Sequence, residues 1–307
     1  MTTCLHKERL SLYPAPTGAI VYSGGVWNIP EGIEIDAFQE GIFIVVPDGK
    51  VVQNPLEIIY QLDGSQAAPW VHIVVGRNSS VSVREKIVAQ KPSSMNAMCT
   101  VSIQEGGSLS HTLLEPFFPH VESSFSFRAF LEQGASLSCV SATALPNSTK
   151  RSEIYLEGRG ASAHFKELSL AGRNKEHTTS VTIEHRGEES VSSQLFKGVV
   201  AGSSRVESSV VMRGQRSKSQ QLSRFLVVDD MAKTSNRPNM SVFADDVEAT
   251  HGATTGRLED EALYYLKTRG LPEQEALSLC IHGFCREIVD LFPEKDLLEA
   301  GLEEMLV

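Results

Sequence analysis

The sequence has few aromatic residues, no excess of positive charge and no long apolar run. Aromatic side chains make up only 7% of the 307 residues, which is little for a groove that binds sugars by stacking. Asp and Glu (38) outnumber Lys and Arg (28), and the net charge of −10 argues against nucleic acid or an anionic membrane surface as the main partner. No apolar run approaches the roughly 20 residues needed to span a bilayer. The composition therefore predicts a globular protein that acts on neither a membrane nor a nucleic acid.

Cysteine is scarce and lacks metal-binding spacing. The five residues are Cys4, Cys99, Cys139, Cys280 and Cys285. None forms a CxxC pair, so the spacing of a zinc ribbon or a ferredoxin is missing. Cys99 and Cys139 fall in alternating apolar patterns, which predicts small buried residues. The N-terminal stretch MTTCLHKERLSLYP has no apolar core of the signal-peptide type, so we expect a cytoplasmic protein whose thiols stay reduced.

Several signatures of enzymes are also missing. The sequence has no Walker A loop, no GxSxG nucleophile elbow and no HExxH helix. Asp245 and Asp246 are adjacent, so on a strand they would point to opposite faces and could not easily act as a facing acid–base pair. These absences disfavour the enzyme classes that carry those motifs. A carbohydrate-active β-helix enzyme is the less favoured alternative.

A repeat with a period near 27 residues runs through the middle of the chain. Its copies begin at Gly76, Gly106, Gly134, Gly160, Gly187 and Gly214. A short alternating stretch precedes most of these glycines, as in CTVSIQEG, FSFRAFLEQG, RSEIYLEG and SVTIEHRG. Each unit is therefore interpreted as a strand, a glycine-containing turn and a second strand.

Such a unit cannot bury its apolar face alone, but stacked units share one continuous core. The sequence therefore predicts a mainly β fold, with a right-handed β-helix (β-solenoid) core followed by a small α-helical C-terminal region. A β-sandwich is the structural alternative, because short strands with glycine turns also suit it. We expect an N-terminal lead-in over 1–40, rich in Pro and Gly and loosely structured. The β-helix core is expected over 41–256 and the helical region over 257–307.

The last part of the chain has helical periodicity. Ala262, Tyr265 and Leu266 have helical spacing, and Gly270 is a suitable C-terminal stop. Pro272 suits the first turn of a second helix. The apolar stripe of this second helix is expected at Ala276, Leu279, Cys280, Gly283, Phe284 and Ile288. A third short helix is expected around 295–306.

One histidine has unusually small neighbours, in the stretch FADDVEATHGATTG. Gly252 and Ala253 follow His251 and leave it sterically open. Neutral imidazole is a good ligand for iron and zinc, but one histidine cannot hold a metal cluster alone. A ligand role for His251 therefore needs ligands from another chain. The alternative is that HGATTG is a tight turn joining the solenoid to the helices, and residue chemistry leaves both interpretations open.

The stretch RPNMSVFADDVEATHGATTGRLEDEALYYLKTRGLPEQEAL resembles the C-terminal core of the SufB/SufD family of the SUF iron–sulfur cluster assembly system. The positions that carry the resemblance are Pro238, Met240, Val242, Ala244, Asp245, Asp246, Val247, His251, Gly252, Ala253, Thr254, Gly256, Tyr265, Leu266, Arg269 and Gly270. Upstream, SSQLFKGVVAGSSRVESSVVMRGQRSKSQQLSRFLV resembles the FKGV stretch of the family. The resemblance covers about residues 50–290 and implies a β-helix core followed by a helical part.

The resemblance implies a non-catalytic scaffold subunit of the SUF assembly complex. Such a subunit pairs with a SufB-like subunit and binds the SufC-like ATPase through its helical region. It implies no stably bound cofactor, but a transient iron–sulfur cluster at the partner interface. In SufB a cysteine two residues before the histidine is the proposed cluster ligand, and here Ala249 holds that place. This favours a SufD-like member over a SufB-like homodimeric scaffold, and leaves open a homodimer in isolation.

The resemblance also implies the candidate site residues. His251 is the candidate cluster and interface residue, and would ligate metal together with the partner chain. The candidate contacts with the ATPase are Tyr264, Lys267, Arg269, Leu271 and Glu273. Tyr265, Leu266 and Phe284 are expected to pack the helices on the solenoid instead.

Overall fold

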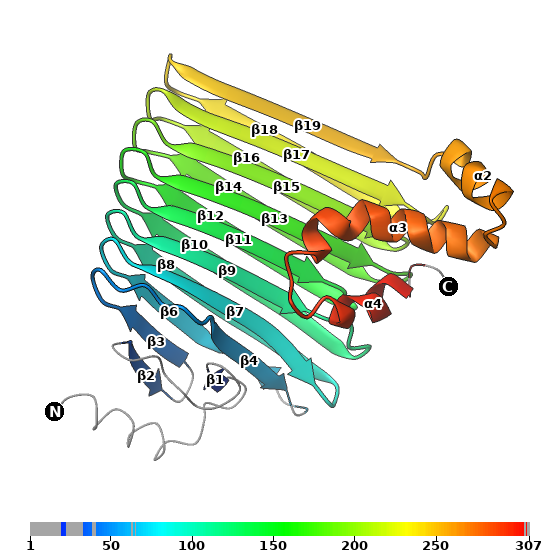
Figure 1. The fold of residues 1–307 in the computed structure, drawn as a ribbon, viewed down its shortest axis with the longest axis horizontal. Helices are drawn as coiled ribbons and strands as arrows, with labels where there is room; N and C mark the ends of the chain where they lie inside the picture. The colour runs from blue at the N-terminus through cyan, green and yellow to red at the C-terminus, as the bar shows by residue number, and fades with distance from the viewer. Residues whose placement is uncertain are drawn as a thin grey trace.

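The protein is a flattened β-solenoid with helices on one face (Figure 1). The structure, a computed structural model, describes residues 20–22, 33–38, 41–62, 64, 66–303 and 305. Along most of the solenoid, successive strands alternate between two facing sheets, so each coil adds one strand to each sheet. Among the described residues, all ladders are parallel except the two at the N-terminal end, β1–β4 and β2–β3. The predicted solenoid core is confirmed, and the alternative of an antiparallel sandwich is wrong.

The strands of the two sheets are as follows. Sheet 1, in spatial order, contains β1 (Ile20–Tyr22), β4 (Leu56–Leu62), β7 (Ser80–Ala89), β9 (Ser108–Glu115), β11 (Ser136–Thr143), β13 (Ser162–Ala171), β15 (Val191–Val200), β17 (Ser217–Val227) and β19 (Val247–Gly256). Sheet 2 contains β2 (Glu34–Phe38), β3 (Gly41–Val46), β6 (Trp70–Val75), β8 (Ser93–Ile103), β10 (Val121–Leu131), β12 (Asn147–Leu156), β14 (Glu176–His185), β16 (Ser203–Met212) and β18 (Lys233–Val242). A short strand, β5 (Gln66–Ala67), pairs with β8.

The strict alternation of the sequence explains why the coils stack. In β10, every second residue from Val121 to Leu131 is buried, and the residues between them are half-buried or exposed. The buried set points into the space between the sheets, which we call the lumen. Ile58 and Ile73 from opposite sheets, and Ile183 from a later coil, are all completely buried in its apolar core. Stacking of coils therefore buries in each strand the face that a single unit would leave in water.

The turns explain the repeated glycines. In each of six successive turns one residue adopts a left-handed backbone conformation with positive φ: Asn78, Gly106, Gly134, Gly160, Glu189 and Arg216. Gly187 and Gly214 instead have negative φ but lie against the backbone of the preceding turn. A Cβ on Gly214 would lie 2.0 Å from the carbonyl oxygen of Gly187. Glycine is therefore required in some turns for conformation and in others for close approach.

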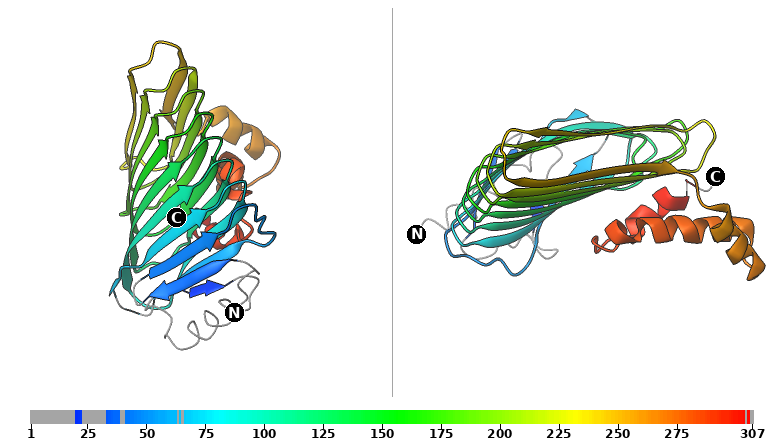
Figure 2. Two further views of the ribbon diagram at one scale, coloured as in Figure 1. Left: turned by 90° about the vertical axis from the view of Figure 1, so that its left-hand side faces the viewer. Right: turned by 90° about the horizontal axis from the view of Figure 1, so that it is seen from above.

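Three helices follow the solenoid: α2 (Asp260–Thr268), α3 (Glu273–Val289) and α4 (Asp296–Glu303). Figures 1 and 2 show α3 and α4 lying along the outer face of sheet 1, with α2 beyond the C-terminal end of β19. A second apolar cluster joins this face to the helices, for example through Leu168, Leu170, Ile281 and Leu298. The α-helical C-terminal region is thus confirmed. No helix in the described part of the chain is long and apolar enough to cross a membrane.

The predicted apolar stripe of α3 is partly wrong. The buried residues of this helix are Ala276, Ile281, Cys285 and Ile288. Leu279, which was expected in the stripe, is 52% exposed. The helix has apolar residues on more than one side, and contact with sheet 1 selects the side that contains Ile281 and Cys285. As expected, Gly270 ends α2 with a positive φ, and Pro272 directly precedes α3.

Most of the expected lead-in over 1–40 lies outside the described residues, namely 1–19, 23–32 and 39–40. The described parts of this segment include β1 and β2, which pair antiparallel with β4 and β3. They lie at the N-terminal end of the stack, far from β19 (Figure 1).

Candidate functional site

His251 lies in the middle of β19, the last strand of sheet 1. The interpretation of HGATTG as a tight turn is therefore wrong. His251 is aligned with Gln221 of β17, which is buried in the lumen. Because parallel ladders keep side chains on the same face, Ala249, His251 and Ala253 face the lumen. His251 is nevertheless exposed, since no described strand stacks beyond β19.

The lumen therefore has an open mouth at its C-terminal end. The lumen-facing residues of β19 are Val247, Ala249, His251, Ala253 and Thr255, from their alignment with buried residues of β17. The corresponding residues of β18 are Thr234, Asn236, Pro238, Met240 and Val242, from their alignment with β16. Small side chains on both sides of His251 leave the imidazole as the largest group of β19 at this mouth.

The backbone of β19 also has a free edge. Lys218 of β17 donates its N–H to Ser190 in the preceding coil, and Lys218 is aligned with Glu248. Along a strand, the N–H groups point alternately to the two sides. Glu248 thus donates back to β17, whereas the N–H groups of Ala249, His251, Ala253 and Thr255 point to the free edge. His251 therefore presents its side chain and its backbone at the same open end.

The free edge of β18 differs at one residue. Lys233 donates back to Gly202, so the N–H groups of even-numbered residues in β18 point outward. Pro238 falls at one of these outward positions and has no N–H. Proline in a sheet is tolerated at such an edge and blocks further pairing there. Among the two terminal strands, β19 is thus the one with an uninterrupted row of donors.

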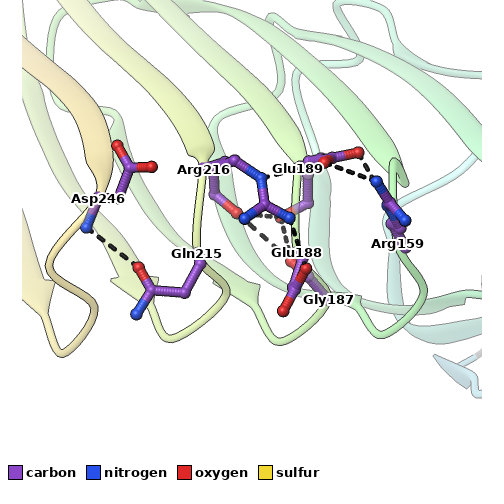
Figure 3. Close-up of polar contacts among 9 residues, drawn as sticks. Arg159, Gly187, Glu188, Glu189, Gln215, Arg216 and Asp246 are labelled. Carbon is purple, nitrogen blue, oxygen red and sulfur yellow. Dashed lines mark hydrogen bonds and ion pairs between the residues drawn. The ribbon is translucent and has the colours of Figure 1, made fainter.

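The turn that leads into β19 is held by its backbone. The N–H of Asp246 donates to Gln215 Oε1 at 3.1 Å, and the N–H of Arg216 donates to the carbonyl oxygen of Asp246. Figure 3 shows the contact between Asp246 and Gln215, which connects the last turn to the one before it. Asp245 and Asp246 lie in this turn rather than on a strand. The two carboxylates therefore belong to the solvent-exposed rim and not to the lumen.

Charged side chains connect the turns of the preceding coils on the same side of the solenoid. Glu189 accepts hydrogen bonds from Arg159 at 2.8 Å and from Arg216 at 3.0 Å, and Arg216 also pairs with Glu188 at 2.7 Å (Figure 3). The hydrogen bonds from Arg159 and Arg216 lower the pKa of Glu189 to about 2. These groups are exposed, so each pair contributes little to stability. Their effect is to align successive turns.

The helices are anchored to the solenoid by Lys197 of β15, in the FKGV stretch. Its Nζ donates to the carbonyl oxygen of Phe284 at 2.9 Å and pairs with Glu287 at 2.8 Å. The hydrogen bond from Lys197 lowers the pKa of the Glu287 carboxyl. Lys197 is only 6% exposed, so this contact lies under α3. Movement of α3 would therefore act on sheet 1, the sheet that contains β19.

The structure places the five candidate ATPase contacts on α2, on the segment that joins it to α3, and at the first residue of α3. None of the residues of α2 is buried, and Tyr264 is 72% exposed. Lys267 and Glu273 form an ion pair at 2.9 Å, which joins the two helices. Arg269 is exposed, and Leu271 is half-buried. The five residues thus lie on a short helical arm that presents a tyrosine and charged groups to solvent.

The residues expected only to pack the helices behave differently from one another. Phe284 packs against the apolar cluster between α3 and sheet 1. Leu266 is half-buried. Tyr265 is 57% exposed and stacks under the guanidinium of Arg269, at 5.2 Å from ring centroid to Cζ. Packing on the solenoid is therefore wrong for Tyr265, because α2 lies beyond the C-terminal end of β19.

Sequence reasoning missed Lys197 and the polar groups inside the lumen. Glu115 and Lys150 form a completely enclosed ion pair at 3.3 Å, and His177 donates or accepts through both ring nitrogens. The alternation of apolar and polar residues predicts that these positions are buried. It does not predict their contacts, because the contacting residues lie one coil apart or across the lumen. An alignment of the repeats in register would have placed them together.

The fold and this site define a class of protein: a β-solenoid with one open end, a free strand edge and a helical arm anchored to its side. The SUF system FeS cluster assembly, SufBD core domain, matches residues 58–284. This match covers most of the chain, so the protein belongs to the SufBD family, and the resemblance found in the sequence is confirmed.

Relatives with curated names agree with the family. The SufD protein of Escherichia coli is 27% identical over 151 residues, which cover 48% of this chain and 36% of that protein. The Bacillus subtilis SufD is 25% identical over 269 residues (82% and 60%). The Bacillus subtilis SufB is 22% identical over 269 residues (84% and 58%). The chain thus spans less than two thirds of the length of these relatives, which are named iron–sulfur cluster assembly proteins.

Proposed function

We propose that this chain is a non-catalytic, SufD-like scaffold subunit of a SUF iron–sulfur cluster assembly complex. The observation that carries this proposal is the open last coil, where His251 lies beside a free strand edge. A partner strand that pairs with β19 would bring its own ligands to the imidazole. The cluster would be cargo formed between the two chains, and no cofactor would be resident at this interface.

The partner on this edge is proposed to be a SufB-like subunit. Four outward N–H groups on β19 can each donate to a backbone carbonyl oxygen of an added strand, whereas Pro238 interrupts the edge of β18. Ala249 cannot supply a thiolate, so any sulfur ligand must come from the partner. A SufB-like homodimer would lack that thiolate on both sides, which disfavours it.

The partner on the helical arm is proposed to be a SufC-like ATPase. Tyr264, Lys267, Arg269, Leu271 and Glu273 are the proposed contacts. The arm is exposed, and Lys197 connects α3 to sheet 1. Motion of the ATPase could therefore reach the open end of the solenoid through a single sheet. We propose a cytoplasmic location for the complex, where such thiol-dependent chemistry is kept reduced.

The proposal is tested by the mass of the complex. The full chain is co-expressed with the SufB-like and SufC-like proteins of the same source, and light scattering after gel filtration gives the mass of each species. We expect one species that contains all three chains. A chain that elutes as a monomer or homodimer and ignores both partners would contradict the proposal and favour the alternative of an independent β-helix enzyme.

Two variants separate the roles of the backbone and the imidazole. Ala253→Pro removes one outward N–H without breaking a hydrogen bond to β17, and should weaken pairing with the SufB-like subunit while the ATPase still binds. Ala253→Ser keeps the N–H and is the matched control. His251→Ala should leave the complex intact but reduce cluster assembly in it. If His251→Ala assembles clusters at the normal rate, the ligand role is wrong.

A further inference from the structure

Five chemically active side chains meet inside the lumen near the N-terminal end of the solenoid. They are Tyr60 of β4, Glu85 of β7, Cys99 of β8, His111 of β9 and Cys139 of β11. Each is at most 4% exposed. Cys99 belongs to sheet 2, and the other four belong to sheet 1. The cluster therefore spans the lumen, at the end of the stack opposite to His251 (Figure 1).

Three of these residues have the geometry of a metal site. One ligand atom from each of Glu85, Cys99 and His111 lies within 4.8 Å of the other two. Glu85 Oε1 lies 2.8 Å from His111 Nε2. Metal bonds of about 2.0–2.3 Å keep ligand atoms roughly 3–4 Å apart, so only small side-chain shifts would admit an ion. A set of one carboxylate, one imidazole and one thiol is found in zinc and iron sites.

We propose that Glu85, Cys99 and His111 bind one borderline divalent cation, of the Zn²⁺ and Fe²⁺ class, inside the lumen. Mg²⁺ and Ca²⁺ are excluded because they require oxygen ligands throughout. The site is separate from the cluster proposed at His251 and does not depend on the proposed partners. It ties sheet 1 to sheet 2 through β7, β8 and β9.

The remaining two residues support the ligands from behind. Tyr60 donates its hydroxyl hydrogen to Glu85 Oε2, which leaves Oε1 for the ion. Cys139 Sγ lies 3.6 Å from His111 Nδ1, which leaves Nε2 for the ion. Hydrogen bonds of this kind fix the orientation and the tautomer of metal ligands. The ring of Phe127 lies 4.9 Å from that of His111 and limits its rotation.

Charge balance permits such a site in a buried place. Without metal, burial raises the pKa of the Cys99 thiol to about 12, so it is protonated. Burial by itself lowers the pKa of His111, but its hydrogen bonds with Cys139, Cys99 and Glu85 outweigh this and raise the pKa well above its ordinary value. The thiol and the imidazole thus both hold protons that a bound cation would displace.

Binding exchanges two protons for one ion. The divalent cation takes the place of the thiol proton of Cys99 and the Nε2 proton of His111, and both protons pass to solvent. The thiolate and the Glu85 carboxylate then balance the two positive charges of the ion. With the ion bound, the enclosed site therefore has no net charge and avoids the free-energy cost of a net buried charge.

The test is the metal content of the full, untagged chain. The protein is refolded with Zn²⁺, passed through gel filtration in metal-free buffer, and analysed for metal per chain by mass spectrometry. We expect about one zinc per chain, because loading during folding bypasses the closed lumen. Refolding with Co²⁺ should give thiolate-to-cobalt charge-transfer absorption. Less than a tenth of an ion per chain after refolding would overturn the proposal.

Variants assign the ion to this cluster. Cys99→Ala and Glu85→Gln should each weaken zinc binding by about 100-fold, since loss of a mere supporting residue already costs 10–100-fold. Cys285→Ala is the matched control, because Cys285 is equally buried but lies on α3, outside the lumen. It should retain the zinc. If the folded Cys99→Ala variant retains zinc, the ion is bound elsewhere and the proposal is wrong.

The pH dependence gives an independent readout. The apparent zinc affinity should rise with pH near neutrality, because the Cys99 thiol, whose pKa burial raises to about 12, must lose its proton to bind the ion. If Cys99→Ala fails to fold, the nearly isosteric Glu85→Gln variant still tests whether this cluster binds the zinc. A zinc affinity that does not change with pH would contradict ligation by Cys99 and His111.

Discussion

Replacement of Lys197 by Met removes the ammonium group that anchors α3 to the solenoid. The aliphatic stem is retained, so the change isolates the polar contacts. Lys197 Nζ donates to the Phe284 carbonyl oxygen at 2.9 Å and pairs with Glu287 at 2.8 Å. A hydrogen bond from a charged donor contributes about 1.5–3 kcal/mol. Since Glu287 is 49% exposed, its ion pair adds only a few tenths.

We therefore expect the docking of α3 to weaken by about 2 kcal/mol, which is roughly a 30-fold rise in the local opening constant. Amide hydrogen exchange measures this opening directly in α3. Exchange in the lumen strands should stay unchanged, because Lys197 points out of the lumen. Lys166→Met is the matched control, since Lys166 on the neighbouring strand acts on Glu287 only through its charge.

Two outcomes would show that Lys197 does not anchor α3 as described: a change of less than threefold in α3, or equal changes in α3 and the lumen strands. The first would mean that the apolar cluster alone holds the helix. The second would mean that Lys197 supports the solenoid itself. In the wild-type protein, the opening constant of α3, obtained from exchange rates corrected for the intrinsic pH dependence of amide exchange, should rise as the pH falls through the lowered pKa of Glu287, because protonation removes the ion pair.

Three further predictions concern stability. Lys150→Ala should destabilise the protein by about 3–5 kcal/mol in urea unfolding, because it leaves the carboxylate of Glu115 buried without its partner. A smaller loss in the double variant with Glu115→Gln would confirm that the unpaired carboxylate causes the destabilisation. Burial by itself raises the pKa of Glu115, but Lys150 and nearby hydroxyl groups outweigh burial and lower this pKa. The free energy of unfolding should therefore have its full value above the ordinary pKa of Glu and fall as the pH drops through the lowered pKa of Glu115. An acid titration monitored by circular dichroism measures this loss. Gly134 has a φ of +64° and no close neighbour, so Gly134→Ala should lower the free energy of unfolding by about 1–2 kcal/mol in thermal or urea unfolding. Gly214→Ala should lower it more, because the new Cβ would lie 2.0 Å from a backbone atom. Equal losses would mean that close approach and backbone conformation do not distinguish the two glycines.

The solenoid architecture was predictable from the sequence because each coil corresponds to one repeat. The period near 27 residues and the alternation within each unit are consequences of stacking, so a solenoid could be derived without a template. The turns were only partly predictable. Glu189 and Arg216 adopt left-handed conformations that their residue types disfavour, and the stack of hydrogen bonds around them maintains these conformations.

The last coil was hard to interpret for the opposite reason. The sequence around His251 consists of Gly, Ala and Thr, which also suits a turn, and the usual alternation fades because β19 is half-buried or exposed along its length. Its partner β17 fixes it as a strand. The exposure of Tyr265 was not predicted, because the spacing of apolar residues along a helix does not show whether another part of the protein packs against that face.

The lumen cluster of Glu85, Cys99 and His111 was invisible to motif searches. Its members lie on three strands, and Cys99 faces the others from the opposite sheet. Only the register of the coils brings them together. Motifs with short spacing depend on one helix or one turn, whereas in a solenoid the neighbours in space are one coil apart in the chain.

We propose that a SufB-like partner chain pairs with the free edge of β19, and amide hydrogen exchange, measured for this chain alone and with the SufB-like subunit, would detect this pairing. We expect an alternating response within one strand: the outward amides of Ala249, His251, Ala253 and Thr255 exchange rapidly alone and at least tenfold more slowly in the complex. The amides of Glu248, Thr250 and Gly252 are already bonded to β17 and should change little. If a stable complex forms and β19 shows no added protection, the partner does not pair with this edge.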